Sequence, residues 1–114
     1  MVSEIMVTEL GEKLKSDDKF VLLDVRELSE LDHAKITDDR LEVLPMSRLA
    51  REGVTALSES VKSKQIPLFV LCHHGNRSMQ VTAWLGQQGY ENVANVRGGI
   101  DEYARRVDPS VGVY

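Results

Sequence analysis

The chain has 114 residues, 42% of them apolar and 28% charged, which predicts one globular domain over residues 1–114 with a core from about residue 5 to 107. The net charge of −4 leaves no basic excess and argues against a nucleic-acid partner or an anionic membrane surface. A single cysteine excludes an internal disulfide and a four-cysteine zinc site. We expect a cytoplasmic protein, where a lone thiol stays reduced, because no apolar run reaches the roughly 20 residues of a membrane span.

In the first half of the chain, short apolar runs alternate with amphipathic stretches. Strands are predicted at residues 5–7, 20–25 and 41–44. Between the first two strands, Thr8 is expected to cap a helix that ends near residue 15. Residues 27–33 are expected to form a short helix that turns Leu28 and Leu31 inward.

The second half continues the alternation with longer elements. Ser47 is expected to cap a helix whose apolar residues follow at helical spacing, namely Ala50, Val54, Leu57 and Val61. Gly53 lies inside this stretch and disfavours the helix by about 1 kcal/mol relative to alanine. The remaining elements are strands at 66–72 and 93–96 and helices at 77–88, with Trp84 in the core, and at 100–107.

This order of elements predicts the fold class. Strands separated by helices pair in parallel through right-handed crossovers. We therefore expect an α/β domain with a small parallel β-sheet flanked by helices on both faces. In such sheets ligands bind at the carboxyl ends of the strands. Cys72 lies at this end of the strongest predicted strand.

A polar loop follows that strand and opens the next helix: Cys72, His73, His74, Gly75, Asn76, Arg77 and Ser78. The first N–H groups of a helix have no partner within it, and Gly75 and Asn76 allow the loop to curl its own N–H groups around one point. The helix dipole and Arg77 add positive charge. These features favour the thiolate of Cys72, so we expect a nucleophile there and substrate binding by residues 73–78.

The sequence allows two alternatives to a reactive cysteine. Cys72 could be a small buried hydrophobe, but the abrupt change from apolar to flexible polar residues argues against an inert core position. His73 and His74 suggest a metal, yet adjacent residues seldom reach one ion and His33 is far away in the sequence. We expect no metal and no cofactor, and we expect the two histidines to wall the loop or to donate to substrate.

Asp24 and Arg26 lie where another buried strand ends. In a structural interpretation the carboxylate and the guanidinium pair and brace the loops. In a functional interpretation Asp24 reaches Arg77 or the loop N–H groups, because both segments follow buried parallel strands. The structural interpretation is favoured, and both residues are assigned a supporting role.

Four segments resemble the signatures of the rhodanese family, in the family's order and spacing. They are residues 21–27 with Asp-Val-Arg, residues 44–47, the loop 72–78, and residues 96–100 with a Gly-Gly turn. The resemblance implies a rhodanese-like fold and a persulfide carried on Cys72. Many relatives have a histidine where this chain has Lys35, between Ala34 and Ile36; no role is assigned to Lys35 or to His33.

The resemblance also implies a sulfurtransferase reaction. The Cys72 thiolate attacks the outer sulfur of a donor such as thiosulfate, sulfite leaves, and cyanide or a thiol then accepts the sulfur. The N–H groups of residues 73–77 are expected to stabilise the terminal sulfur of the persulfide. The expected partners are small-molecule donors and acceptors, and a sulfur-relay protein is a further candidate.

Two other functions stay open at this point. A phosphatase or arsenate reductase of the same fold also combines a cysteine, loop amides and an arginine. Dual-specificity phosphatases use Cys-x5-Arg, whereas Arg77 follows Cys72 with four residues between them, which makes a tighter cradle. A non-catalytic sulfur-carrier or binding module would dock through the acidic surface, although such modules usually lack the cysteine.

Overall fold

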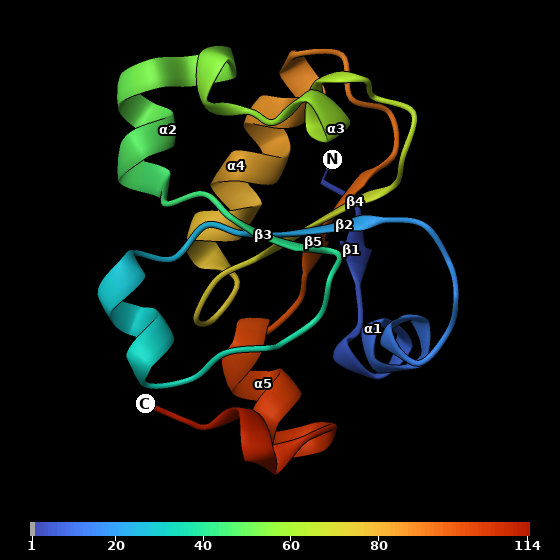
Figure 1. The fold of residues 1–114 in the computed structure, drawn as a ribbon, viewed down its shortest axis with the longest axis vertical. Helices are drawn as coiled ribbons and strands as arrows, with labels where there is room; N and C mark the ends of the chain where they lie inside the picture. The colour runs from blue at the N-terminus through green and yellow to red at the C-terminus, as the bar shows by residue number, and fades with distance from the viewer. Residues whose placement is uncertain (1) are drawn as a thin grey trace.

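The computed structural model describes residues 2–114. Five strands form one sheet in the order β1-β5-β4-β2-β3 (Figure 1). Their bounds are β1 Glu4–Ile5, β2 Val21–Asp24, β3 Leu41–Val43, β4 Leu68–Leu71 and β5 Val93–Val96. Every neighbouring pair is parallel, which confirms the predicted α/β class.

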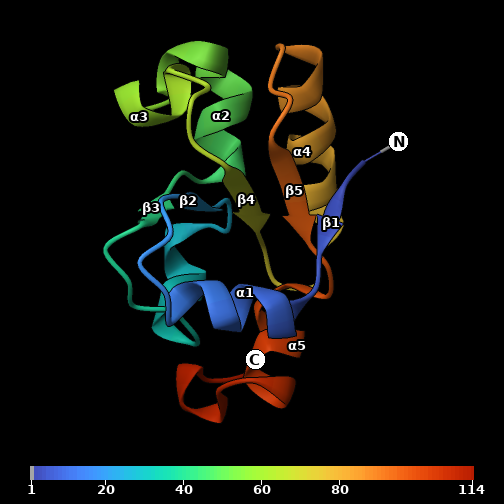
Figure 2. The same cartoon turned by 90° about the vertical axis from the view of Figure 1, so that its right-hand side faces the viewer.

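Helices cover both faces of the sheet, as the sequence predicts. On one face lie α2 Met46–Glu52, α3 Glu59–Lys62 and α4 Asn76–Gln87, and on the other α1 Val7–Leu14 and α5 Gly99–Arg106. Figure 2 shows the two groups on opposite sides of β4 and β5. Three short 3₁₀ helices complete the chain, at η1 Leu28–Asp32, η2 Gly53–Ala56 and η3 Pro109–Val111.

The sheet separates two hydrophobic cores. Side chains of a strand alternate between the faces, so Leu23 and Val70 enter the core under α2, α3 and α4, whereas Leu22 and Leu71 enter the core under α1 and α5. All residues of β2 and β4 are buried. This double burial explains why both strands are nearly continuous in apolar residues.

The boundary predicted near the N-terminus is wrong. The strand ends at Ile5, and the helix begins at Val7 with Met6 as its N-cap, so Thr8 is not the cap. Val7 and Leu10 are fully buried in the core that α1 shares with α5. Val7 therefore meets the core from the first turn of a helix rather than from the end of a strand.

The helix predicted from Ser47 to Val61 is divided into three pieces. α2 starts after Pro45, which is its N-cap, and ends before Gly53, whose φ of +59° breaks the helix. Glycine adopts such an angle without a steric penalty. Ser58 then caps α3 by accepting a hydrogen bond from the N–H of Val61. The apolar spacing was misleading: Ala50 and Val54 are exposed, and the core contacts of this stretch come instead from Leu49, Ala56, Leu57 and Val61.

The prediction for Leu28 is also wrong. Residues 28–32 form a 3₁₀ helix, Leu28 is 65% exposed, and Leu31 is only half-buried. The inward contact of η1 is made instead by Glu30, which binds an arginine described below. A polar contact therefore replaces the expected apolar one.

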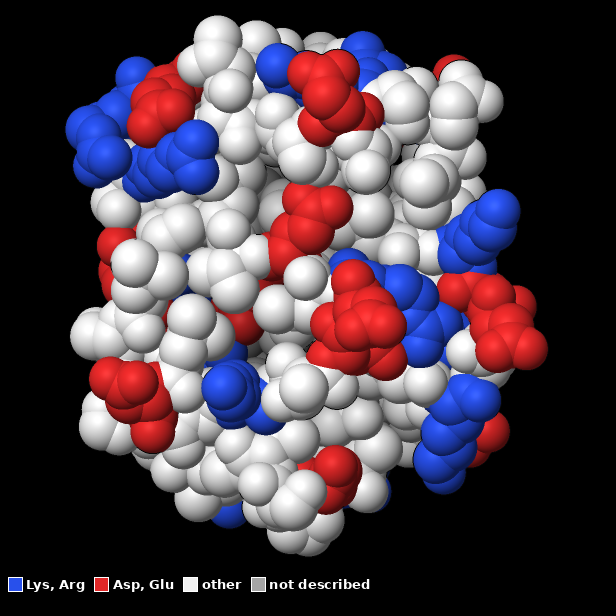
Figure 3. All heavy atoms as spheres, in the orientation of Figure 1, with Lys and Arg blue, Asp and Glu red and all other residues white. Residues whose placement is uncertain are grey.

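The surface mixes charges of both signs. On the face shown in Figure 3, lysine and arginine side chains are interspersed with aspartate and glutamate. Several of these charges form pairs along helices, as Arg48 does with Glu52 on α2. Within residues 2–114, helices long and apolar enough to cross a membrane are absent.

Candidate active site

Cys72 directly follows β4, the central strand of the sheet. The loop after it leads into α4, with the ends of β2 and β5 on either side. The first turn of α5 holds this loop from below, because the N–H of Ile100 donates to the Cys72 carbonyl (2.9 Å) and the N–H of Asp101 donates to the His73 carbonyl (3.1 Å). The loop is thus anchored by a second helix terminus.

Gly99 is required for this close approach. A Cβ atom at Gly99 would lie 2.6 Å from the Cys72 carbonyl oxygen and still closer to the carbonyl oxygen of His73. Its φ of +65° is one that other residues rarely adopt. The Gly-Gly turn therefore has a physical role, since only a glycine lets α5 reach the loop.

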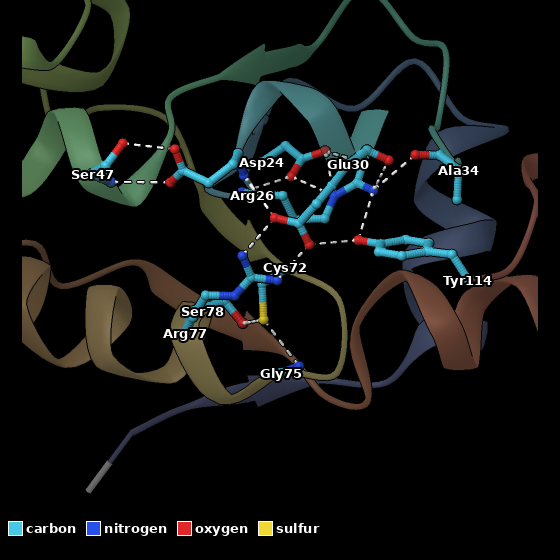
Figure 4. Close-up of polar contacts among 11 residues, drawn as sticks. Asp24, Arg26, Glu30, Ala34, Ser47, Cys72, Gly75, Arg77, Ser78 and Tyr114 are labelled. Carbon is cyan, nitrogen blue, oxygen red and sulfur yellow. Dashed lines mark hydrogen bonds and ion pairs between the residues drawn. The ribbon is translucent and has the colours of Figure 1, made fainter. Parts of the chain in front are cut away.

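The sulfur of Cys72 lies on a buried floor, which we define as Cys72, Gly75, Ser78 and Asn95. The N–H of Gly75 donates to Sγ at 3.0 Å, and the hydroxyl of Ser78 lies 3.2 Å from Sγ (Figure 4). Gly75 is the N-cap of α4 with φ +101°. Asn95, on β5, contacts the Ser78 hydroxyl and donates from Nδ2 to the Gly75 carbonyl (3.2 Å). Cys72 is 1% exposed, so the floor is dry.

A rim of polar and charged side chains lies beside this floor. We define the rim as Glu30, His73, Arg77 and Tyr114. Arg77 donates from both terminal nitrogens to the Glu30 carboxylate, at 2.7 and 2.8 Å (Figure 4). This bidentate hydrogen bonding lowers the pKa of Glu30 to about 2 and raises that of Arg77. The positive charge that the sequence predicts beside the sulfur is present, but a carboxylate already binds it.

Tyr114 completes the rim from the C-terminal segment. Its hydroxyl donates to Glu30 Oε1 (2.9 Å) and accepts from Arg26 Nη1 (3.2 Å). Its ring stacks on His73, with centroids 3.7 Å apart and planes 6° apart. The segment is tied to the domain by the N–H of Lys35, which donates to the Val111 carbonyl. Burial raises the pKa of Tyr114, so the phenol stays protonated at neutral pH.

His73 and His74 stack on each other, with ring centroids 3.8 Å apart. Burial, with the neighbouring charge of His74, lowers the pKa of His73, which favours its neutral form. One ligand atom from each histidine and one from Asp101 lie within 4.8 Å of one another. The planes of the two imidazoles are 29° apart.

Asp24 and Arg26 form a fully buried pair beside the rim. Arg26 donates from Nε to Oδ1 (2.9 Å) and from Nη2 to Oδ2 (2.7 Å) of Asp24. Its third nitrogen reaches the Ala34 carbonyl at 2.8 Å (Figure 4). Asp24 binds Arg26 and makes no hydrogen bond with Arg77. This arrangement agrees with the expectation that the two residues pair with each other.

The structure brings together only part of the predicted loop. Gly75 and Ser78 contact the sulfur, and His73 and Arg77 lie on the rim, whereas Asn76 and His74 are exposed. Sequence reasoning missed three residues of the floor and rim: Glu30, Asn95 and Tyr114. Asn95 left a signal, because it is the one polar residue in the strand Val-Ala-Asn-Val. Glu30 and Tyr114 left no signal in the sequence, because nothing in their sequence context distinguishes them from ordinary exposed residues.

Known proteins resemble this chain in sequence and in fold. Residues 6–106 match the family described as "Rhodanese-like domain". A "Sulfurtransferase" of Allochromatium vinosum is 36% identical over 97% of this chain and 96% of its own length. A rhodanese-related protein from Thermoplasma volcanium superposes with a TM-score of 0.74 and 31% identity, over 92% of this chain and 93% of that one.

Some relatives are much longer. The "Rhodanese-like/PpiC domain-containing protein 12, chloroplastic" of Arabidopsis thaliana is 37% identical over 99% of this chain, which spans 38% of that protein. The family match spans the floor, Glu30, His73, Arg77 and the Gly-Gly turn, and it ends before Tyr114. The family match covers residues 6–106, and the Allochromatium vinosum relative aligns with nearly all of this chain. The chain therefore belongs to the rhodanese-like domain family.

Proposed function

We propose that this protein is a sulfurtransferase that carries a sulfane sulfur as a persulfide on Cys72. The observation that carries the proposal is the position of Sγ at the carboxyl end of the central strand, where the N–H of Gly75 donates to it. A buried sulfur with an amide donor at a helix N-terminus is suited to hold negative charge. The sulfurtransferase name of the relative of equal size supports the same reaction class.

The reaction has two displacement steps. The Cys72 thiolate attacks the outer sulfur of thiosulfate; the new S–S bond forms on Sγ, the S–S bond of the donor breaks, and sulfite leaves with the electron pair. An acceptor, cyanide or a thiolate, then attacks the terminal sulfur of the persulfide, and Cys72 leaves as the thiolate. In each step the nucleophile supplies the electron pair of the new bond and the leaving group keeps the pair of the broken one, so neither step needs an external oxidant or reductant.

The rim controls how a donor reaches the floor. Because Cys72 is 1% exposed, a donor reaches the sulfur only after a local movement of the chain around it. Arg77 is the nearest candidate to receive an anionic donor, and it does so by exchanging the Glu30 carboxylate for the donor's oxygens. The acceptor in the cell is a small thiol or a sulfur-relay protein.

A phosphatase is less well supported by the same geometry. Phosphoryl transfer requires a guanidinium that clamps the phosphate oxygens. Here both terminal nitrogens of Arg77 are bound to Glu30, and one loop amide, that of Gly75, hydrogen-bonds to the sulfur.

Intact mass spectrometry tests the proposal directly. Wild-type protein incubated with thiosulfate gains the mass of one sulfur, and added cyanide removes it as thiocyanate. Cys72→Ala gains none, while Ser60→Ala, an exposed position outside the floor and the rim, behaves as wild type. Hydrolysis of an aryl phosphate without sulfur uptake would favour the phosphatase. Failure of thiosulfate and of small-molecule persulfides as donors, with stable binding of a partner, would favour a non-catalytic module.

A further inference from the structure

The hydroxyl of Ser78 lies within hydrogen-bond distance of two acceptors. One is Sγ of Cys72, at 3.2 Å, and the other is Oδ1 of Asn95, with which it makes a hydrogen bond. A serine hydroxyl has a single proton, so it donates to one of these atoms at a time. Ser78, Asn95 and Cys72 are all at most 1% exposed, so the Ser78 hydroxyl has no bulk water to which it could donate instead.

The orientation of the Asn95 amide decides which acceptor takes the proton. Nδ2 faces the Gly75 carbonyl and the Glu4 carboxylate, each at 3.2 Å, and both of these groups only accept hydrogen bonds. The parallel register of β1 and β5 places Glu4 directly beside Asn95. Oδ1 must therefore face Ser78. An amide oxygen cannot donate, so the Ser78 hydroxyl gives its proton to Asn95.

We propose that Asn95 is a positioning residue that holds the Ser78 proton away from Cys72 while the thiol is protonated and yields it when the thiolate forms. In the thiol form, the Cys72 S–H donates to Ser78 Oγ, and the Ser78 O–H donates to Asn95 Oδ1. When a local movement of the chain exposes the sulfur and the thiol proton leaves to water or to a buffer base, the hydroxyl rotates and donates to Sγ, while Oδ1 loses its partner.

In this arrangement Asn95 opposes the ionisation of Cys72. The hydrogen bond to Asn95 must be broken before the thiolate gains its second donor, so Asn95 makes ionisation of Cys72 more costly. Removing the amide oxygen frees the Ser78 proton for the sulfur. The Gly75 amide stays in place because the Gly75 carbonyl also accepts from the N–H of Met79, at 3.2 Å. A residue that only supports packing would have no such effect.

The pH dependence of Cys72 alkylation measures this effect. Iodoacetamide reacts with the thiolate, and the chain has one cysteine, so its rate reports this sulfur alone. Asn95→Leu, similar in size and without polar atoms, is expected to react about fivefold faster at a pH well below the wild-type midpoint, since ionisation no longer breaks the neutral Ser78–Asn95 hydrogen bond, which contributes about 1 kcal/mol. Ser78→Ala and the double variant Asn95→Leu/Ser78→Ala are expected to lack this gain.

Thr82→Val is the matched control. Thr82 is buried on the same helix and donates to the backbone carbonyl of Ser78, at 2.7 Å, without touching its hydroxyl. Its alkylation profile should follow wild type. A folded Asn95→Leu that reacts at the wild-type rate or more slowly overturns the proposal, and so does a gain that persists when Ser78 is also replaced.

A measurement on the wild-type protein covers the case in which Asn95→Leu does not fold. The side-chain amide resonances of Asn95 are expected to shift with pH at the midpoint of Cys72 alkylation, and to stay constant through that range in Cys72→Ala. Resonances that ignore the ionisation of Cys72 would refute the proposal. The proposal rests on the proposed function only for its biological purpose; neither measurement uses a sulfur donor, so failure of sulfur transfer and failure of this inference are told apart.

Discussion

Two arginine–carboxylate pairs lie beside the active-site loop, and they differ in burial. Asp24 and Arg26 are two residues apart and fully buried, whereas Glu30 and Arg77 are 47 residues apart, with side chains 19% and 34% exposed. Both pairs are bidentate. The buried pair also reaches the Ala34 carbonyl, so most of its hydrogen-bonding groups have a partner in the protein.

The difference in burial separates their functions. Charges that are removed from water must keep their partners, so the Asp24–Arg26 pair is a permanent brace. The half-exposed Glu30–Arg77 pair can open, because water solvates either group when it leaves the other. Tyr114 connects the two, since its hydroxyl accepts from Arg26 and donates to Glu30. Tyr114 therefore links the buried brace to the more exposed pair.

Arg26→Ala should have the largest effect on stability. Asp24 would remain as a buried, unpaired carboxylate, so we expect the free energy of unfolding to fall by about 3 to 5 kcal/mol, as measured by urea denaturation. The control is Arg105→Ala, which removes an exposed partner of Asp101 and should cost at most about 0.5 kcal/mol. Equal losses in the two variants would show that burial does not distinguish these pairs.

Gly99→Ala touches neither pair and tests whether they can hold the loop by themselves. The added Cβ meets the carbonyls of Cys72 and His73 at a positive φ, so we expect a loss of about 2 to 4 kcal/mol and a marked fall in sulfur transfer. Gly86→Ala is the matched control, because no atom lies within 4 Å of its Cβ position and alanine favours the helix by about 1 kcal/mol. Normal transfer by a fully stable Gly99→Ala would mean that the two pairs suffice.

Glu30→Gln should change how stability depends on pH. Arg77 lowers the pKa of Glu30 from 4.5 to about 2 in the folded protein. The carboxylate therefore stabilises the fold above pH 4.5, and this contribution is lost as the pH falls through 2. With allowance for solvent screening we expect about 1 kcal/mol at pH 7.

Unfolding curves recorded between pH 2 and 7 provide the measurement. The difference between wild type and Glu30→Gln should shrink as the pH falls, whereas Glu59→Gln, 94% exposed beside Lys62, should show almost no difference at any pH. A constant difference from pH 7 to 2 would contradict the ion pair as its cause. In a transfer assay, Glu30→Gln should also lower the KM for thiosulfate, because Arg77 no longer needs to leave a carboxylate.

Tyr114→Phe should have the smallest effect. It removes the hydroxyl that joins the two pairs but keeps the ring stacked on His73, so we expect a loss of about 0.5 to 1 kcal/mol. A double-mutant cycle with Glu30→Gln measures the link, since the two losses should not add if the hydroxyl acts through Glu30. Strict additivity would show that Tyr114 and Glu30 stabilise the rim independently.

Much of the fold follows from patterns that are local in the chain. Apolar runs such as residues 20–25 and 66–72 predict buried parallel strands, and the polar loop after the second run predicts the position of Cys72. The errors lie where local pattern and packing disagree. Residues 47–61 carry helical spacing, yet Gly53 breaks the helix, and Leu28 is exposed while Glu30 of the same 3₁₀ helix makes the inward contact.

The sequence by itself determined the α/β class, the parallel sheet and the loop that holds the lone cysteine, because strand periodicity, turn residues and helix starts depend on neighbours in the chain. Only the tertiary structure decided that Glu30 pairs with Arg77, that Asn95 accepts a hydrogen bond from Ser78, and that Tyr114 joins the rim. These contacts connect residues 17 to 84 positions apart, and hydrogen bonds over such separations exist only after the sheet has placed the strand ends together.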